Sequence, residues 1–267
     1  MILFSPAKIN FGLHIKEKRA DGYHNIESIL YPIPLHDVVE FLPASEFSLN
    51  IHGIPIPGSI QENSIWKTYH LMKSCFGLPG LKVQLLKNIP PGSGLGGASS
   101  NASTFIQGIN SYFKLGLSLK DRLDLSAQIG SDCPFFIRSR PALVTGRGNV
   151  LKEIPINLKG YFVHIIYAQQ PISTAWAYAH VHLQERPFPG EELQHIKLSQ
   201  WQNILFNDFE SLVFSHFPAL LLLKNELIKA GAIYASLSGS GSAVFGLFKH
   251  KPILQKGSAN KQWCFSL

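Results

Sequence analysis

Cysteine, methionine and charged residues are scarce in this chain of 267 residues. It has three cysteines and two methionines, and Asp, Glu, Lys and Arg together make up 15% of it. Cys75, Cys133 and Cys264 are far apart and form no Cys-x-x-Cys pair, so neither a disulfide framework nor a cysteine zinc site is indicated. We therefore expect a cytoplasmic protein. Hydrophobic residues make up 45% of the chain, enough for a substantial core, so the low charge does not indicate disorder.

Long apolar runs are missing as well. The longest, Pro218 to Leu223, is far shorter than the roughly 20 residues of a membrane-spanning helix. Pro6, Lys8 and Asn10 interrupt the N-terminal stretch before a signal-peptide core could form, so we predict no targeting segment and no membrane partner. The eleven histidines form no His-Glu-x-x-His motif, which leaves no zinc-hydrolase signature.

Acidic residues are fewer than basic ones, 17 against 24, and the formal net charge is +7. This balance favours acidic partners. The basic residues form no run and no basic helix face, so nucleic acid is not indicated as a partner. A small polyanionic substrate fits the charge at least as well.

The most informative stretch runs from Pro90 to Asn101 and reads Pro-Pro-Gly-Ser-Gly-Leu-Gly-Gly-Ala-Ser-Ser-Asn. A strand pattern at 81–86 precedes it, and apolar residues at helical spacing follow it, namely Ala102, Phe105, Ile106, Ile109 and Phe113. The glycines thus lie where a strand turns into a helix N-terminus. Such an end presents unpaired N–H groups and the positive pole of the helix dipole, so the sequence predicts a phosphate-binding loop.

Other interpretations of this loop fit less well. The glycines match G-x-G-x-x-G, but a dinucleotide fold would place an acidic residue about 20 positions on. Asp121, the nearest candidate, instead forms a capping box with Ser118. A nucleoside-triphosphate P-loop would have Lys and then Ser or Thr after its last glycine, where Ala98 and Ser99 stand. A flexible turn is the simplest alternative, but so many glycine, serine and asparagine residues at a helix start favour a bound anion.

Two segments near the N-terminus carry further candidates. Lys8 and Asn10 lie on one face of a predicted strand, 9–15, and could hold an anion, although a solvated strand face is the simpler interpretation of this strand alone. An Asp-Gly turn follows between two predicted strands. Just past it, Tyr23 offers a ring that can stack and His24 an imidazole that can hydrogen-bond, a combination suited to a planar base.

Two segments in the later part of the chain complete the set. Asp132 follows a predicted helix at 119–129, where it is either a cap or turn residue or, in its apolar surroundings, a candidate general base or orienting group. A second glycine-serine loop, Ser238 to Ser242, joins two strands predicted at 232–237 and 243–248. Alone it is a hairpin turn, but paired with the first loop it could close a site.

The remaining elements indicate an α+β protein of two domains. We predict one or two strands at 26–41 broken near Pro32 and Pro34, a strand at 161–167, and helices at 63–76, 174–182, 209–214 and 220–229. The pattern loosens into Gly, Asn, Pro and Lys at 146–160, which we interpret as the domain boundary. The predicted domains are 1–155 and 156–267.

These motifs, in this order along nearly the whole chain, resemble the GHMP small-molecule kinases. The opening Ser5-Pro6-Ala7-Lys8-Ile9-Asn10 and the segment Arg19-Ala20-Asp21-Gly22-Tyr23-His24 resemble the branch that acts on a cytidine-diphosphate-linked methylerythritol. The resemblance implies an N-terminal domain like ribosomal protein S5 domain 2 and a ferredoxin-like C-terminal domain. It also implies ATP-dependent, Mg²⁺-assisted phosphorylation of the substrate's 2-hydroxyl, a step of non-mevalonate isoprenoid biosynthesis.

The resemblance also implies roles for individual residues. Lys8 and Asp132 would form the catalytic pair, and Ser100 would contact the metal. ATP would bind to Asn63, Lys87, Pro90, Pro91, Gly92, Ser93, Gly94, Leu95, Gly96, Gly97, Ala98, Ser99 and Ser100. The substrate would bind to Asn10, Tyr23, His24, Tyr178 and Gly239.

Two alternatives stay open at this point. A related kinase acting on homoserine, mevalonate or galactose would share the glycine loop, but its substrate has no base for Tyr23 and His24 to hold. The second alternative is a non-catalytic RNA-binding protein, because S5-like domains and a net charge of +7 suit RNA binding. We expect a monomer or a weak homodimer with a small-molecule substrate and no nucleic acid.

Overall fold

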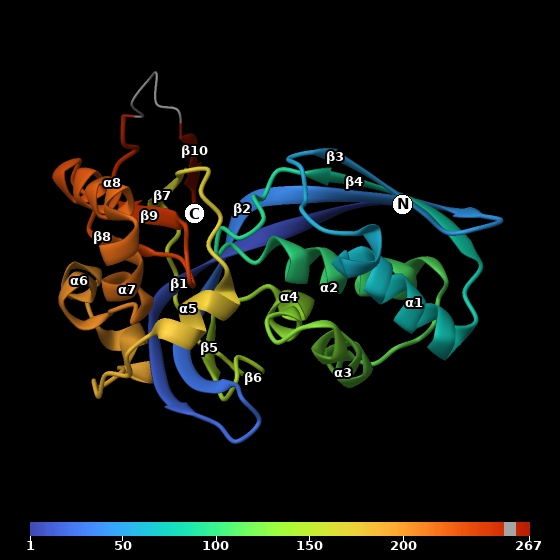
Figure 1. Cartoon of the computed structure of the whole chain (residues 1–267), viewed down its shortest axis with the longest axis horizontal. Coiled ribbons are helices and arrows are strands. Elements are labelled where there is room, and N and C mark those ends of the chain that lie inside the picture. Colours follow the sequence, from blue (N-terminus) through green and yellow to red (C-terminus); the bar gives the residue numbers. More distant parts are fainter. Residues whose placement is uncertain (254–259) are drawn as a thin grey trace. The chain divides into compact units, whose positions relative to one another are not determined.

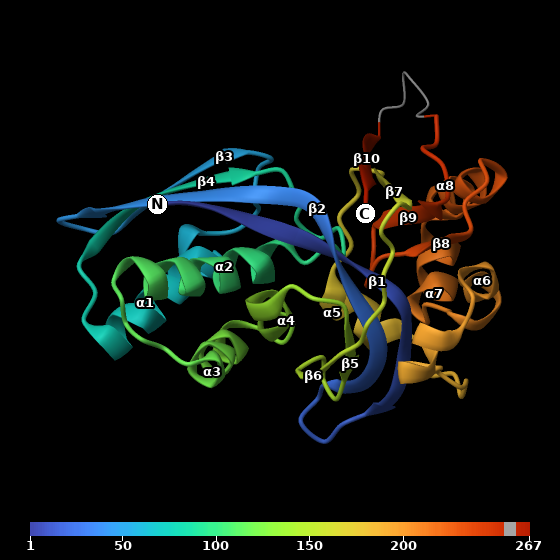
Figure 2. The ribbon, with the colours of Figure 1, turned by 180° about the vertical axis from the view of Figure 1, so that it is seen from behind.

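The computed structural model describes residues 1–253 and 260–267 of an α+β chain (Figures 1 and 2). Its residues group into two compact units, and each unit is assembled from separate stretches of sequence. The first unit contains Met1–Ala7, Leu35–Pro91 and Gly96–Arg140; the second contains Lys8–Pro34, Gly92–Leu95 and Pro141–Leu267. The sequence-based domain limits, 1–155 and 156–267, stay a prediction.

Two long strands, β1 (Ile2–Lys18) and β2 (His24–Ala44), pair with each other and contribute residues to both units. The predicted strand and the turn that follows it are confirmed. The predicted break near Pro32 and Pro34 is wrong, because β2 is continuous. Strand β2 pairs with β5 through residues 28–30 and with β4 through residues 38–44. Pro32 and Pro34 lie between these two segments, so neither of these two ladders needs a hydrogen bond from their nitrogen atoms.

The first unit packs helices against its part of the sheet. Its further elements are β3 (Ser48–Gly53), a 3-10 turn (Ile60–Glu62), α1 (Ser64–Phe76), β4 (Gly80–Lys87), α2 (Gly97–Tyr112), α3 (Leu119–Ile129) and α4 (Cys133–Arg138). Strand β4 runs antiparallel to β2 and parallel to β3. A buried core joins the sheet to α1 and α2, with Val39, Phe41, Tyr69, Val83, Phe105 and Ile109 all fully buried.

Local sequence signals explain where these helices begin and end. The Asn63 side chain caps α1 by accepting a hydrogen bond from the Ile65 N–H at 2.9 Å. Gly77, with φ of 63°, ends the same helix in the left-handed conformation. Ser118 and Asp121 form the predicted capping box of α3. Of the predicted apolar stripe, Ala102, Phe105, Ile106 and Ile109 are buried residues of α2, whereas Phe113 follows the helix as its C-cap and is partly buried.

The second unit is built on an antiparallel sheet in the order β10-β7-β9-β8. Its elements are β5 (Ala142–Thr145), β6 (Val150–Glu153), β7 (Phe162–Tyr167), α5 (Thr174–His180), two 3-10 turns (Gly190–His195 and Leu198–Gln200), α6 (Trp201–Ile204), α7 (Phe209–His216), α8 (Pro218–Lys229), β8 (Tyr234–Leu237), β9 (Ala243–Phe248) and β10 (Lys261–Ser266). Side chains from β1, α7, α8, β8 and β9 share one core, among them Leu13, Phe209, Val213, Leu227, Leu237 and Val244.

Two strands of this unit, β6 and β10, were not predicted from the sequence. The stretch 146–160 was predicted as a loose boundary, but it begins with the turn of a hairpin in which β5 pairs with β6. Strand β6 is short and largely exposed, so it has little apolar signal. Strand β10 pairs with β7 and was not predicted. Of the C-terminal tail, 255–267, the structure describes residues 260–267.

In the described part of the chain, no helix has by itself the length and hydropathy needed to cross a bilayer. Helices α7 and α8 reach these values only when taken together, and the angle between them is 115°.

Candidate functional site

The second unit holds one part of the glycine loop, Gly92–Leu95, against the second glycine-serine loop. The N–H groups of Ser242 and Ala243 donate to the carbonyl oxygens of Gly92 and Ser93, at 3.3 and 3.0 Å. The Ser238 hydroxyl donates to the Gly94 carbonyl at 3.0 Å. These three hydrogen bonds support the expectation that the two loops lie together.

Gly94 is the closest point of this contact. Its φ is 76°, and a Cβ atom built on it would lie 1.8 Å from the Ser238 carbonyl oxygen. Only glycine allows both this conformation and this approach. The glycine predicted as part of a phosphate-binding loop is thus also required for packing the two loops.

Lys8 and Asn10 lie beside these loops, and both are buried, with 4% and 3% of their surface exposed. The solvated strand face that their alternation suggested is therefore wrong. The Lys8 ammonium donates to Asn10 Oδ1 at 2.6 Å, and Asn10 Nδ2 donates to Ser28 Oγ at 2.8 Å. Ser28 in turn donates to the Gly12 carbonyl at 2.6 Å, so the Asn10 amide is fixed in one orientation.

Both loops lie close to Lys8. The Lys8 N–H donates to the Leu95 carbonyl at 3.0 Å, which ties the first loop to β1. A Cβ atom built on Gly239 would lie 3.5 Å from Lys8 Nζ and 3.3 Å from the Gly94 carbonyl oxygen. The second unit therefore brings together four predicted site residues, Lys8, Asn10, Gly94 and Gly239.

The predicted base-binding residues form a second group in the same unit. The His24 and Tyr178 rings stack with centroids 5.2 Å apart and an angle of 22° between planes. The Tyr23 side chain is 51% exposed, and the Arg147 guanidinium lies 5.2 Å from its ring centroid. Burial, and secondarily the charge of Lys18, lowers the pKa of His24 below its usual 6.5. The ring is therefore neutral at pH 7 and can both donate and accept hydrogen bonds.

The first unit contains the start of α2, where the rest of the glycine loop, Gly96–Ser100, lies. Gly96 takes the N-cap position with φ of 75° and supplies no side chain to cap the helix. Ser100 Oγ and Asn101 Oδ1, at the fourth and fifth residues of α2, are buried, and neither has a hydrogen-bond partner. Unsatisfied buried polar atoms beside an uncapped helix N-terminus are what a phosphate or metal contact would require.

The Asp132 segment adjoins this helix start within the same unit. The Ser103 hydroxyl of α2 donates to the Cys133 carbonyl at 2.6 Å. A Cβ atom on Gly130 would lie 4.0 Å from Ser99 Oγ. Asp132 occupies the N-cap position of α4, but its side chain makes no capping hydrogen bond there. The alternative that Asp132 serves as a helix cap is therefore not supported.

The thiol of the neighbouring Cys133 is buried. Cys133 is 1% exposed, and burial raises the pKa of its thiol to about 11. The thiol is protonated at neutral pH and is a poor nucleophile or metal ligand.

Asn63 and Lys87, both predicted near the nucleotide, have structural partners in the first unit. Asn63 caps α1, and Lys87 forms a buried ion pair with Asp37. Asp37 also accepts hydrogen bonds from the Asn88 and Ile89 N–H groups, at 2.7 and 2.8 Å. Burial lowers the pKa of Lys87, while Asp37 acts in the opposite direction. Lys87 Nζ also lies 3.0 Å from a Cβ atom built on Gly97, so it borders the first residue of α2.

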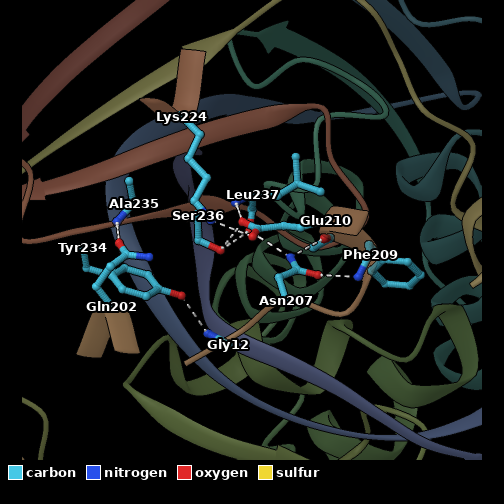
Figure 3. Close-up of polar contacts among 11 residues, drawn as sticks. Gly12, Gln202, Asn207, Phe209, Glu210, Lys224, Tyr234, Ala235, Ser236 and Leu237 are labelled. Atoms are coloured by element: carbon cyan, nitrogen blue, oxygen red, sulfur yellow. Dashed lines mark hydrogen bonds and ion pairs between the residues drawn. The ribbon is translucent and has the colours of Figure 1, made fainter. Parts of the chain in front are cut away.

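The sequence-based reasoning missed several residues that support these groups. Ser28 and Asp37 gave no signal of their own, because their partners are far away in the sequence. Asn207 and Glu210, drawn in Figure 3, hold the start of the second loop. Asn207 and Asp208 precede a helix, and that spacing is a capping signature that could have singled them out. Among the residues described, no three His, Cys, Asp or Glu side chains lie close enough to bind a metal.

Comparison with known proteins shows to which family the chain belongs. The GHMP kinases N terminal domain matches residues 63–140, and the GHMP kinases C terminal domain matches residues 191–258. The chain is similar to the 4-diphosphocytidyl-2-C-methyl-D-erythritol kinase of Porphyromonas gingivalis, with 42% identity covering 97% of this chain and 96% of the relative. The corresponding kinase of Bacteroides thetaiotaomicron is 43% identical, covering 93% and 92%.

A solved structure gives the same result. The crystal structure of a 4-(cytidine 5'-diphospho)-2C-methyl-D-erythritol kinase superposes with a TM-score of 0.79 at 27% identity, covering 92% of this chain and 90% of that one. The two-domain GHMP kinase fold predicted from the sequence is thereby confirmed. The chain belongs to the 4-diphosphocytidyl-2-C-methyl-D-erythritol kinase family of GHMP kinases.

Proposed function

We propose that this protein transfers the γ-phosphoryl group of ATP to the 2-hydroxyl of 4-diphosphocytidyl-2-C-methyl-D-erythritol. The products are ADP and the 2-phosphate, an intermediate of non-mevalonate isoprenoid biosynthesis. The observation that carries the proposal is the near-full-length similarity to kinases of this name. Membership in the GHMP kinases implies ATP as the phosphoryl donor.

The reaction requires positioning and charge neutralisation more than covalent chemistry. In our proposal the loop residues 90–100 hold the ATP phosphates, and the Lys8 ammonium stabilises the negative charge of the moving phosphoryl group. Asp132 orients or deprotonates the attacking hydroxyl. Two observations support this role. Lys8 is buried, and its hydrogen bond to Asn10 holds the ammonium in a fixed position.

Recognition of the cytosine base is assigned to Tyr23, His24 and Tyr178. The ring stack of His24 and Tyr178 and the exposed face of Tyr23 support stacking and hydrogen bonding to a planar base. A neutral His24 provides one donor and one acceptor for the base edge. Asn10, fixed by Ser28, and Gly239 are assigned to the reacting end of the substrate.

Mg²⁺ fits the start of α2. Ser100 Oγ is buried there without a hydrogen-bond partner. In kinases Mg²⁺ is usually coordinated by the nucleotide phosphates and only a few protein ligands. Ser100 would therefore contact the ion, with Asn101 Oδ1 as a second oxygen nearby. When bound, Mg²⁺ neutralises phosphate charge.

The proposal also covers partners and location. We propose a cytoplasmic protein that acts as a monomer or a weak homodimer, with no nucleic-acid or membrane partner. Scattered basic residues and the lack of a single helix fit to cross a bilayer, in the described ranges, support it. Sedimentation at several protein concentrations tests the oligomeric state.

The deciding experiment is ATP turnover with Mg²⁺, comparing the cytidine substrate with homoserine, mevalonate and galactose. We expect turnover with the cytidine compound alone. In the same assay Asp132→Asn should lower kcat by about 10²- to 10⁴-fold, the usual contribution of a general base. Asp124→Asn, an exposed carboxylate in the same unit, is the matched control and should leave kcat unchanged.

Two results would contradict the proposal. Turnover with another acceptor would assign the chain to a different GHMP kinase activity. A folded protein that binds RNA with steeply salt-dependent affinity, and turns over no acceptor, would instead support the RNA-binding alternative.

A further inference from the structure

Strand β8 is an edge of its sheet, and side chains from the preceding helices occupy its open side (Figure 3). Gln202 Oε1 accepts a hydrogen bond from the Ala235 N–H at 2.7 Å. Glu210 Oε1 accepts one from the Leu237 N–H at 2.9 Å, and Lys224 pairs with the same carboxylate at 2.6 Å. These contacts fix the strand up to the residue at which the second glycine-serine loop begins.

Asn207 extends this support into the loop itself. Its Nδ2 donates to the Leu237 carbonyl at 2.9 Å and to the Gly239 carbonyl at 2.8 Å. Its Oδ1 accepts from the Phe209 N–H at 3.0 Å, which sets the orientation of the amide. With 4% of its surface exposed, the side chain has all its polar atoms occupied. Asn207 thus holds the carbonyl groups on either side of Ser238.

The backbone around Asn207 is tied to the strand that carries Lys8 and Asn10. The Leu13 N–H donates to the Phe206 carbonyl at 2.8 Å, and the Asp208 N–H donates to the Leu13 carbonyl at 2.9 Å. One side chain therefore connects β1 to the second loop. Among the side chains drawn at this edge in Figure 3, it is Asn207 that hydrogen-bonds to Gly239.

We propose that Asn207 is a positioning residue for the kinase reaction, a conclusion that rests on the proposed function. By holding the Gly239 carbonyl, it keeps Gly239 beside the Lys8 ammonium and Ser238 on Gly94. A trans peptide unit is planar, so fixing the Gly239 carbonyl also turns the Ser240 N–H away from Asn207. Asn207 touches neither substrate nor phosphate in this proposal and acts through the loop.

Asn207→Asp tests the role because it keeps the size and the acceptor but loses the donor. A carboxylate there would face two carbonyl oxygens, so the loop should shift, and kcat should fall about 100-fold at pH 8.5, as expected for a displacement of about 1 Å. At lower pH the new carboxyl becomes protonated and regains one donor. The ratio of the variant's kcat to that of the wild type should therefore rise as the pH is lowered to 6.5.

Gln202→Ala is the matched control, since it removes one hydrogen bond from the same strand edge without touching the loop. It should lower the melting temperature and leave kcat within about twofold of the wild type at every pH. If Asn207 had only a structural role, the two variants would lose similar stability and similar activity, and the ratio would not change with pH. Similar losses of activity in the two variants would overturn the inference, and so would a ratio that stays constant with pH.

Hydrogen exchange of the amides at 238–243 provides a readout that does not depend on turnover. Exchange should be faster in Asn207→Asp and unchanged in Gln202→Ala. Unchanged exchange in Asn207→Asp overturns the inference even if activity falls. An inactive wild-type protein would overturn the proposed function instead, and the exchange data would still decide whether Asn207 holds the loop.

Discussion

The contact between the two glycine loops makes a strong prediction at Gly94. Alanine there would place a Cβ atom 1.8 Å from the Ser238 carbonyl oxygen, whereas real Cβ atoms essentially never come within 3.0 Å of such an atom. The obstacle is backbone, so no side chain can rotate away. The two loops must separate by more than an ångström, or the first loop must leave its φ of 76°.

The cost can be worked out from the contacts that separation breaks. The hydrogen bonds from Ser238 Oγ, from the Ser242 N–H and from the Ala243 N–H to the first loop would be lost, each worth about 1 kcal/mol net. Placing alanine in the left-handed region adds about 1–2 kcal/mol. We expect Gly94→Ala to lower the free energy of unfolding by about 4–5 kcal/mol.

Gly231→Ala is the matched control. Gly231 lies in the same unit, has φ of 92° and has no atom within 4 Å of a Cβ position, so only the backbone strain of about 1–2 kcal/mol applies. Urea unfolding followed by tryptophan fluorescence, with Trp201 buried in this unit, measures both variants. If the two variants lost the same free energy to within about 0.5 kcal/mol, the loop contact would not be energetically important.

Two further predictions concern titration and the buried ion pair. Burial lowers the pKa of His24, so the KM for the cytidine substrate should be constant above pH 6.5 and rise below it as the ring becomes protonated. Measured over a pH series, this rise should appear in the wild type and be absent in His24→Gln. Lys87→Met should lower the free energy of unfolding by about 3–5 kcal/mol, because it leaves the Asp37 carboxylate buried and unpaired. Lys120→Met, which breaks an exposed pair, should lower the free energy of unfolding far less in the same denaturation assay.

Local patterns in the sequence predicted most of the elements. The capping box at Ser118 placed the start of α3, and the apolar stripe that follows the glycines placed α2. The glycine loop could be recognised because both its strand and its helix are adjacent to it in the sequence. Each of these signals acts over a few residues, which is the range in which sequence patterns are informative.

The features that could not be predicted depend on partners distant in sequence. Lys8 and Asn10 alternate with apolar residues as a solvated face would, and their burial follows from Ser28 and from loops that the fold brings to them. Asn207 joins residues of β8 and the second loop about thirty positions away. The continuity of β2 through its prolines likewise depends on where β4 and β5 pair with it.

The interleaved order of the second unit has a consequence for biosynthesis. Leu13 on β1 has Phe206 and Asp208 as backbone partners and shares a core with Phe209 and Leu237. A ribosome adding about 5–20 residues per second needs roughly 11 to 45 seconds to go from Leu13 to Leu237. Throughout that interval the apolar side chains of this part of β1 lack their core. The nascent chain should therefore depend on chaperones early in translation, and pausing before α7 should lower the yield of folded enzyme.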